Sequence, residues 1–127
     1  MTDTHFADEM LGLLRARYPR FHDKAYLFTL SALKSVMEPL DPPRHISGTE
    51  LAEGCGRLAV QRFGPMARTV LGHWGIHGTK DLGQIVYALV DCGVLVTQEG
   101  DSLDDFEGVF DFAEAFENDY PWGANIP

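Results

Sequence analysis

The residues around position 85 constrain the fold most, because they carry the strongest helical pattern in the chain. Leu82, Ile85, Val86, Leu89 and Val90 follow the i, i+3, i+4, i+7, i+8 spacing of a single helical face. This spacing predicts an amphipathic helix that begins after the glycine-containing turn at 75–78 and ends at Gly93. We expect Thr79 to cap its first turn through the side-chain hydroxyl.

Four more helices are predicted before this one. Apolar spacing predicts helices over 4–17 and 22–38, and the apolar stripe of the second is expected to face the core. Ser47 and Glu50 form an S-x-x-E capping box, which predicts that a third helix begins there. Gly64 followed by Pro65 separates this third helix from a fourth, since glycine favours a helix end and proline a first turn.

The C-terminal part is expected to contain a β-hairpin. Residues 94–97 (Val-Leu-Val-Thr) form a short β-like run, 108–112 could supply a return strand, and 113–118 a last helical turn. The order helix, short turn, helix, hairpin is that of winged-helix domains. The predicted fold is therefore α+β and mostly helical, with about five helices and a C-terminal hairpin. One domain is expected over 1–127, with a helical part at about 4–92 and a hairpin and acidic aromatic part at about 93–122.

Composition excludes several classes of protein. The chain of 127 residues is long enough to bury a core without disulfides or metal. It contains no apolar run long enough to span a membrane and no signal-peptide pattern. Its two cysteines, Cys55 and Cys92, are far apart and form no CxxC motif, which favours a reducing cytoplasm.

Charge is distributed very unevenly along the chain. Residues 81–127 contain eleven acidic residues and no lysine or arginine, whereas residues 1–80 contain all ten basic residues and eight acidic ones. The acidic part also contains several aromatic residues, so we expect it to fold onto the core rather than form a disordered tail. Three interpretations stay open: a solvated end that keeps the protein soluble, a docking surface for a basic partner, and a mimic of nucleic acid.

Motifs of known chemistry are weak or missing. His73 and His77 have the spacing of a helical two-histidine metal site, but glycines interrupt the helix and no third ligand is placed. The aspartates that begin at Asp101 do not match a calcium loop. No nucleophile elbow or phosphate-binding loop is present. We therefore assign no catalytic, metal or cofactor-binding residue and expect no enzyme, although a role for either cysteine stays open.

Several strings resemble those of a family of small bacterial proteins of unknown function. They are HISGxEL at 45–51, FG at 63–64, VLxxWGI at 70–76, TxDxGxIV at 79–86 and DSxxDF at 101–106. Leu82 departs from the aromatic residue expected at its position. The resemblance covers roughly residues 6–120 and implies a stand-alone bacterial domain, with no known activity or cofactor.

These observations lead to a functional hypothesis. We expect a cytoplasmic, non-enzymatic protein–protein interaction module whose acidic segment docks on a basic protein surface. The candidate partner-binding residues are Asp101, Asp104, Asp105, Glu107, Phe106, Phe110, Trp122 and Trp74.

Two other functions remain as alternatives. A winged-helix regulator that binds nucleic acid is disfavoured, because the expected reading helix and wing carry more acids than cations. A small metal-dependent enzyme is the third possibility. A membrane role is not expected, and homo-oligomerisation through the 22–38 helix stays open.

Overall fold

The computed structural model describes residues 2–42 and 44–118, and the side chains between residues 8 and 116 within these ranges. It contains five α-helices: α1 (Thr2–Arg17), α2 (Asp23–Met37), α3 (Gly48–Phe63), α4 (Ala67–His73) and α5 (Thr79–Asp91). Three short turns of helix accompany them: the 3-10 turns η1 (Gly64–Met66) and η2 (Leu103–Phe106), and the π-helical turn η3 (Glu114–Asn118).

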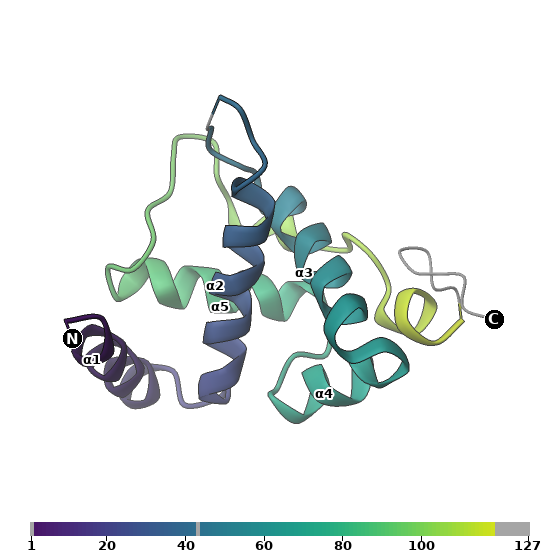
Figure 1. Ribbon diagram of the computed structural model, residues 1–127, viewed down its shortest axis with the longest axis horizontal. Coiled ribbons are helices and arrows are strands. Elements are labelled where there is room, and N and C mark those ends of the chain that lie inside the picture. The colour runs from purple at the N-terminus through teal and green to yellow at the C-terminus, as the bar shows by residue number, and fades with distance from the viewer. Residues whose placement is uncertain (1, 43, 119–127) are drawn as a thin grey trace.

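The helices surround a single hydrophobic core. In Figure 1, α2 crosses α5 and lies beside α3, while α1 and η3 lie at opposite ends of the molecule. The backbones of α2 and α3 approach closely at Gly54, where a Cβ atom would overlap Val36. The core extends from Met10 on α1 to Phe116 on η3, so the described elements share one interior. No helix in the described ranges is both long enough and apolar enough to cross a bilayer.

The helices expected from apolar spacing are present, and α5 buries the predicted face. Leu82, Ile85 and Leu89 are fully buried, whereas Val86 and Val90 are only half-buried. The stripe predicted for α2 faces the core in part: Tyr26 is buried and Leu33 packs half-buried against the core, whereas Met37 is 38% exposed. The face of α2 that enters the core also carries smaller side chains, namely Ala25, Thr29 and Ala32, which permit its close contact with α3.

The predicted C-terminal hairpin was wrong, and with it the α+β, winged-helix-like fold class. The described residues contain no β-strand and are all helix, turn or loop. Glycines with positive φ at 93, 100 and 108 bend the chain around the β-like run. Between them, Ser102 and Asp105 form a capping box that starts η2, and the 108–112 segment leads into the last helical turn. Residues 94–97 therefore have no partner strand.

Candidate functional site

The acidic segment is held to the helices by Phe106, the last residue of η2. Its ring is 2% exposed and packs against both Gly48 of α3 and Gly83 of α5. A Cβ atom at Gly48 or Gly83 would lie only 2.8 or 2.9 Å from the ring, so only glycine allows this approach. Phe106 was predicted to bind a partner. That prediction was wrong, because the side chain is part of the core.

Thr79 fixes the same segment from the start of α5. Its hydroxyl donates to the carbonyl oxygen of Phe106 at 2.7 Å and accepts from the backbone N–H of Val109 at 3.3 Å. The prediction that Thr79 caps α5 was therefore wrong: the N-cap is Gly78, which has no side chain to accept a hydrogen bond. Thr49 of α3 makes a third hydrogen bond to the segment, since its hydroxyl donates to the carbonyl oxygen of Asp105 at 3.0 Å.

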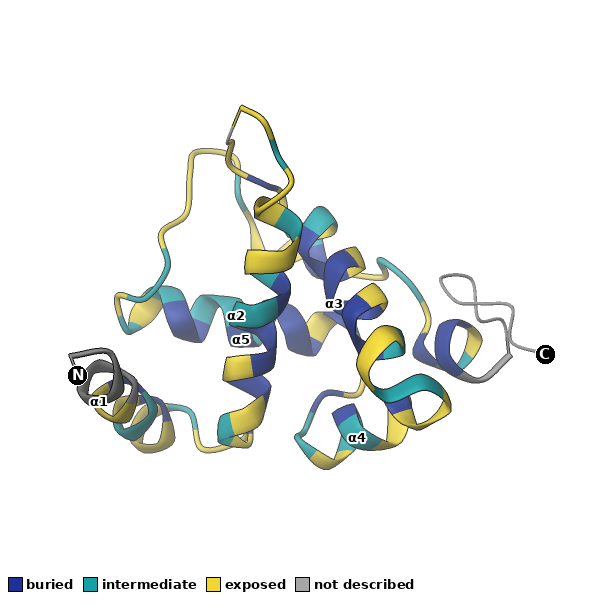
Figure 2. Ribbon diagram, in the orientation of Figure 1, coloured by how far each residue is buried: buried dark blue, intermediate teal, exposed yellow. Residues whose placement is uncertain are grey.

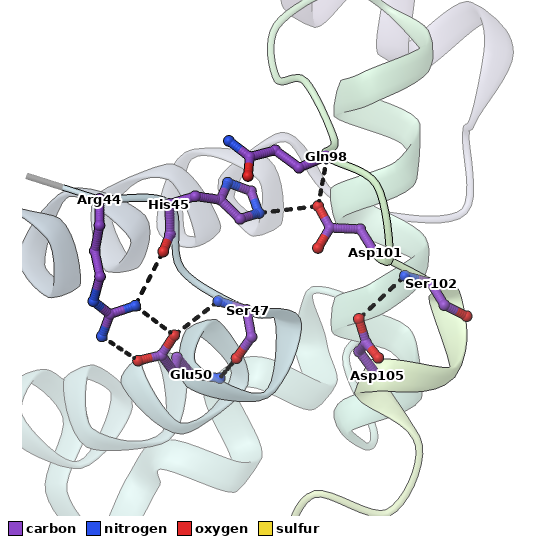
Figure 3. A network of polar contacts seen from close by, with 8 residues as sticks. All are labelled: Arg44, His45, Ser47, Glu50, Gln98, Asp101, Ser102 and Asp105. Atoms are coloured by element: carbon purple, nitrogen blue, oxygen red, sulfur yellow. Dashed lines mark hydrogen bonds and ion pairs between the residues drawn. The ribbon is translucent and has the colours of Figure 1, made fainter.

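Two of the predicted partner-binding carboxylates already have intramolecular contacts. One oxygen of Asp101, Oδ2, accepts from the backbone N–H of Gln98 at 2.7 Å and lies 3.0 Å from His45 Nε2 (Figure 3). Asp105 Oδ2 accepts from the backbone N–H of Ser102 at 3.1 Å. Asp101 and Asp105 therefore stabilise the loop through their Oδ2 atoms, which are not free for a partner.

The His45–Asp101 contact joins two loops that are far apart in the sequence. Figure 3 shows the 44–50 segment and the 98–105 segment facing each other, with this contact bridging them. Sequence analysis placed the two residues in separate strings, HISGxEL and DSxxDF, and gave no indication that they pair. Their strings, HISGxEL and DSxxDF, meet here with the TxDxGxIV string of α5 at the Phe106 ring.

The predicted capping box at the start of α3 is confirmed. Glu50 N–H donates to Ser47 Oγ at 3.1 Å, and Ser47 N–H donates to Glu50 Oε1 at 2.8 Å. Arg44 also pairs with Glu50, its Nη2 lying 2.7 Å from Oε2. The hydrogen bond from Arg44, together with that from the Ser47 backbone, lowers the pKa of Glu50 to about 2. Arg44 therefore forms an ion pair with Glu50 in the first turn of α3.

A half-open pocket of about 280 Å³ lies between α2, α3, α5 and the loop 94–106. Its walls are mostly apolar and include Leu33, Met37, Val86 and Val90. All four belong to the apolar stripes of α2 and α5; Leu33 and Val86 also pack against the core, whereas Met37 and Val90 do not. The charged or titratable side chains around it are His45, Asp101, Asp105 and Tyr87, and neither lysine nor arginine lines it. A pocket of this kind favours an apolar group next to a cation or hydrogen-bond donor.

The 99–114 segment carries several exposed carboxylates. Glu99, Asp104, Glu107, Asp111 and Glu114 are all exposed. Lys80 Nζ lies 4.0 Å from Glu107 Oε2, and this is the one ion pair that these five residues form within the described part of the chain. Of the predicted docking residues, Asp104 and Glu107 are therefore the carboxylates available at the surface.

The predicted aromatic anchors are less accessible than expected. Trp74 is half-buried, with its ring centroid 5.8 Å from Phe28 and 5.7 Å from Phe63. Phe110 is also half-buried and stacks on Phe112 at 5.5 Å. Trp122 lies outside the described residues.

Asp81, Cys55 and the histidine pair complete the candidate groups. Asp81 is buried and links two segments, since Arg20 Nη2 lies 2.6 Å from its Oδ1 and His77 N–H donates to its Oδ2. Burial raises the pKa of the Cys55 thiol to about 12, which keeps it protonated at neutral pH. Among the described residues, no three histidine, cysteine or acidic side chains are grouped as metal ligands. His73 and His77 therefore have no third ligand there.

Comparison of the chain with known protein families, with curated proteins and with solved structures found no match.

Proposed function

We propose that this protein is a non-enzymatic interaction module that binds a basic surface of a partner protein through the exposed carboxylates of its 99–114 segment. One observation carries the proposal: this segment is acidic and exposed, yet it is fixed on the core by Phe106 and Thr79. A charged surface in a fixed arrangement loses less conformational entropy on binding than a disordered acidic tail does.

Charge supports the same function. Glu99, Asp104, Asp111 and Glu114 form no ion pair within the described residues, so their field is not neutralised locally. Such a field attracts a basic surface over about one Debye length, ~8 Å at physiological salt. The same charge disfavours the nucleic-acid-binding alternative, which also depended on a hairpin wing that the described residues do not form.

The test is to neutralise exposed carboxylates whose oxygens accept no hydrogen bond within the loop. Of the three chosen, only Glu107 has a charged neighbour, Lys80 of α5, within the described residues. The docking variant is Glu99→Gln, Asp104→Asn and Glu107→Gln together. Asp101 and Asp105 are left intact, because removing them would disturb the loop itself. The matched control changes net charge by the same amount outside the segment, with Asp8→Asn, Glu9→Gln and Glu53→Gln, all of which are exposed.

The assay has two steps. Proteins captured from a nuclease-treated native lysate at low and moderate salt are identified by mass spectrometry. The purified candidate is then measured against wild type and both variants on a biosensor. Surface charge pairs are worth about 0.2–1 kcal/mol each, so the docking variant should weaken binding by about tenfold at low salt. Equal affinity and equal salt dependence for all three proteins would show that the acidic segment is not the docking surface.

A further inference from the structure

The loop that follows α5 combines β-forming residues with unpaired backbone groups. Val94, Val96 and Thr97 are β-branched and favour extended conformations. The N–H groups of Val94 and Leu95 donate to the carbonyl oxygen of Leu89 at 2.9 and 3.4 Å. Beyond these, the N–H groups of Val96 and Thr97 and the carbonyls of 94–97 have no hydrogen-bond partner within the described residues. The backbone is thus free to pair with another chain.

This loop is exposed and borders the apolar pocket. Figure 2 shows most of it as exposed, and Val96 is 82% exposed. Residues 94–97 all line the pocket, opposite Leu33 and Met37 of α2. Its volume of about 280 Å³ accommodates an aliphatic or aromatic side chain, whose burial would favour binding.

The polar rim of the pocket is suited to a basic neighbour of that apolar side chain. Asp101 uses Oδ2 for its contacts with His45 and Gln98, and its Oδ1 accepts no hydrogen bond within the described residues. Glu99 is exposed two positions away. A lysine or arginine next to an inserted apolar residue would find Asp101 Oδ1 and the exposed Glu99 carboxylate as acceptors.

We infer that an extended segment of the partner adds alongside Val94–Thr97 as a β-strand and inserts an apolar side chain into the pocket, with lysine or arginine residues beside Asp101 and Glu99. This is recognition by strand addition, in which main-chain hydrogen bonds give affinity and a pocket for alternate side chains gives specificity. The inference rests on the proposed function, because it assumes a basic protein partner, and it names how that partner is held.

A designed peptide tests the mode of binding directly. The probe is a synthetic peptide that alternates lysine with valine and leucine, titrated into the full chain and followed by two-dimensional amide NMR. We expect shift changes at residues 94–97 and around the pocket, and slower amide exchange of Val96 and Thr97. A peptide of the same sequence, N-methylated at alternate backbone positions, keeps charge and side chains but loses donors. It should bind about tenfold more weakly, since each lost hydrogen bond is worth about 1 kcal/mol.

Variants of the protein test the pocket. Val86→Phe places a larger side chain at the half-buried wall and should weaken the lysine peptide by about tenfold or more. Leu27→Phe is the matched control, because Leu27 is 42% exposed on α2 and does not line the pocket. Both variants are first compared with wild type by thermal unfolding. If Val86→Phe lowers stability, Val96→Pro serves instead, since proline removes an N–H from an exposed loop.

Three results would overturn the inference. They are no binding of the lysine peptide, equal affinity for the N-methylated peptide, and full affinity of both Val86→Phe and Val96→Pro. In each case the proposed function is tested separately, by measuring the affinity of the triple charge variant for the captured partner. Loss of the partner on neutralising Glu99, Asp104 and Glu107, combined with any of these results, would leave an acidic docking surface that does not use strand addition.

Discussion

Substitution of two glycines by alanine should have opposite effects on stability. Gly83 lies inside α5, where the Cβ atom of alanine would meet three atoms of the Phe106 side chain, two of them in the ring, at 2.9 Å. Gly12 lies inside α1, where a Cβ atom would meet nothing within 4 Å. The change in helix propensity is the same at both sites and favours alanine by about 1 kcal/mol. The difference between the two variants therefore measures the contact with Phe106.

The ring cannot move away easily. Gly48 holds its other edge, with ring atoms 2.8–2.9 Å from where a Cβ would lie, and the side chain is 2% exposed. Overpacking of this kind costs about 1–3 kcal/mol. After the gain in helix propensity, Gly83→Ala should lose up to about 2 kcal/mol, a fall in melting temperature of up to roughly 10 °C for a domain of this size. It should be about 1–3 kcal/mol less stable than Gly12→Ala, because the propensity gain cancels between the two variants. Gly12→Ala should gain up to about 1 kcal/mol.

Urea and thermal unfolding of both variants provide the measurement, and a double-mutant cycle tests the cause. In a Phe106→Leu background, the shorter side chain should remove most of the cost of Gly83→Ala, giving a coupling of about 1 kcal/mol or more. If Gly83→Ala is as stable as Gly12→Ala, or if its cost is unchanged beside Phe106→Leu, then the packing of this ring on α5 does not anchor the loop as described.

Three further predictions follow from individual contacts. The pKa of Glu50, lowered to about 2 by Arg44, means that its contribution to stability is present above its ordinary pKa of 4.5 and is lost as the pH falls toward 2. Glu50→Gln should flatten this part of the acid dependence of the urea midpoint, and an unchanged slope would contradict the assignment. A thiol reagent at neutral pH should label the half-buried Cys92 and spare Cys55, whose pKa of about 12 reflects burial, until the protein unfolds; equal labelling in the native state would show that Cys55 is accessible. Thr79→Val removes two hydrogen bonds to the acidic segment and should cost about 1–3 kcal/mol, with faster amide exchange at Val109; loss of stability without faster exchange there would place the effect elsewhere.

The helices could be predicted from the sequence because their signals are local. The stripe around Ile85, the capping box of Ser47 and Glu50, and the Gly64–Pro65 break each act within a few residues. Local signals failed at 94–112, where β-branched residues predicted a strand. A strand needs a partner, and here the capping box that starts at Ser102 commits the following residues to a helical turn.

The candidate site could not be predicted as a whole, because it depends on contacts between distant segments. His45 and Asp101 are brought together only when η2 packs between α3 and α5. The glycines at 48 and 83 carried the missing signal: each stands on a helix that packs against an aromatic ring, and neither is needed for helix formation. A sequence with two such helical glycines and an acidic aromatic string indicates a close approach but not which ring makes it.

The arrangement of apolar residues also argues that this surface serves recognition. The core uses Leu82, Ile85 and Leu89 of α5, whereas Val86 and Val90 remain half-buried on the wall of an open pocket. Apolar side chains that face an open pocket remain in contact with water and therefore add little to the stability of the fold. The loop that borders the pocket carries the exposed Glu99 and backbone groups that have no hydrogen-bond partner within the described residues, and Phe106 fixes this loop in place. A partner that fills the pocket would cover the apolar wall, pair with these backbone groups and neutralise the exposed carboxylate. The fixed loop would also reduce the entropy lost on binding.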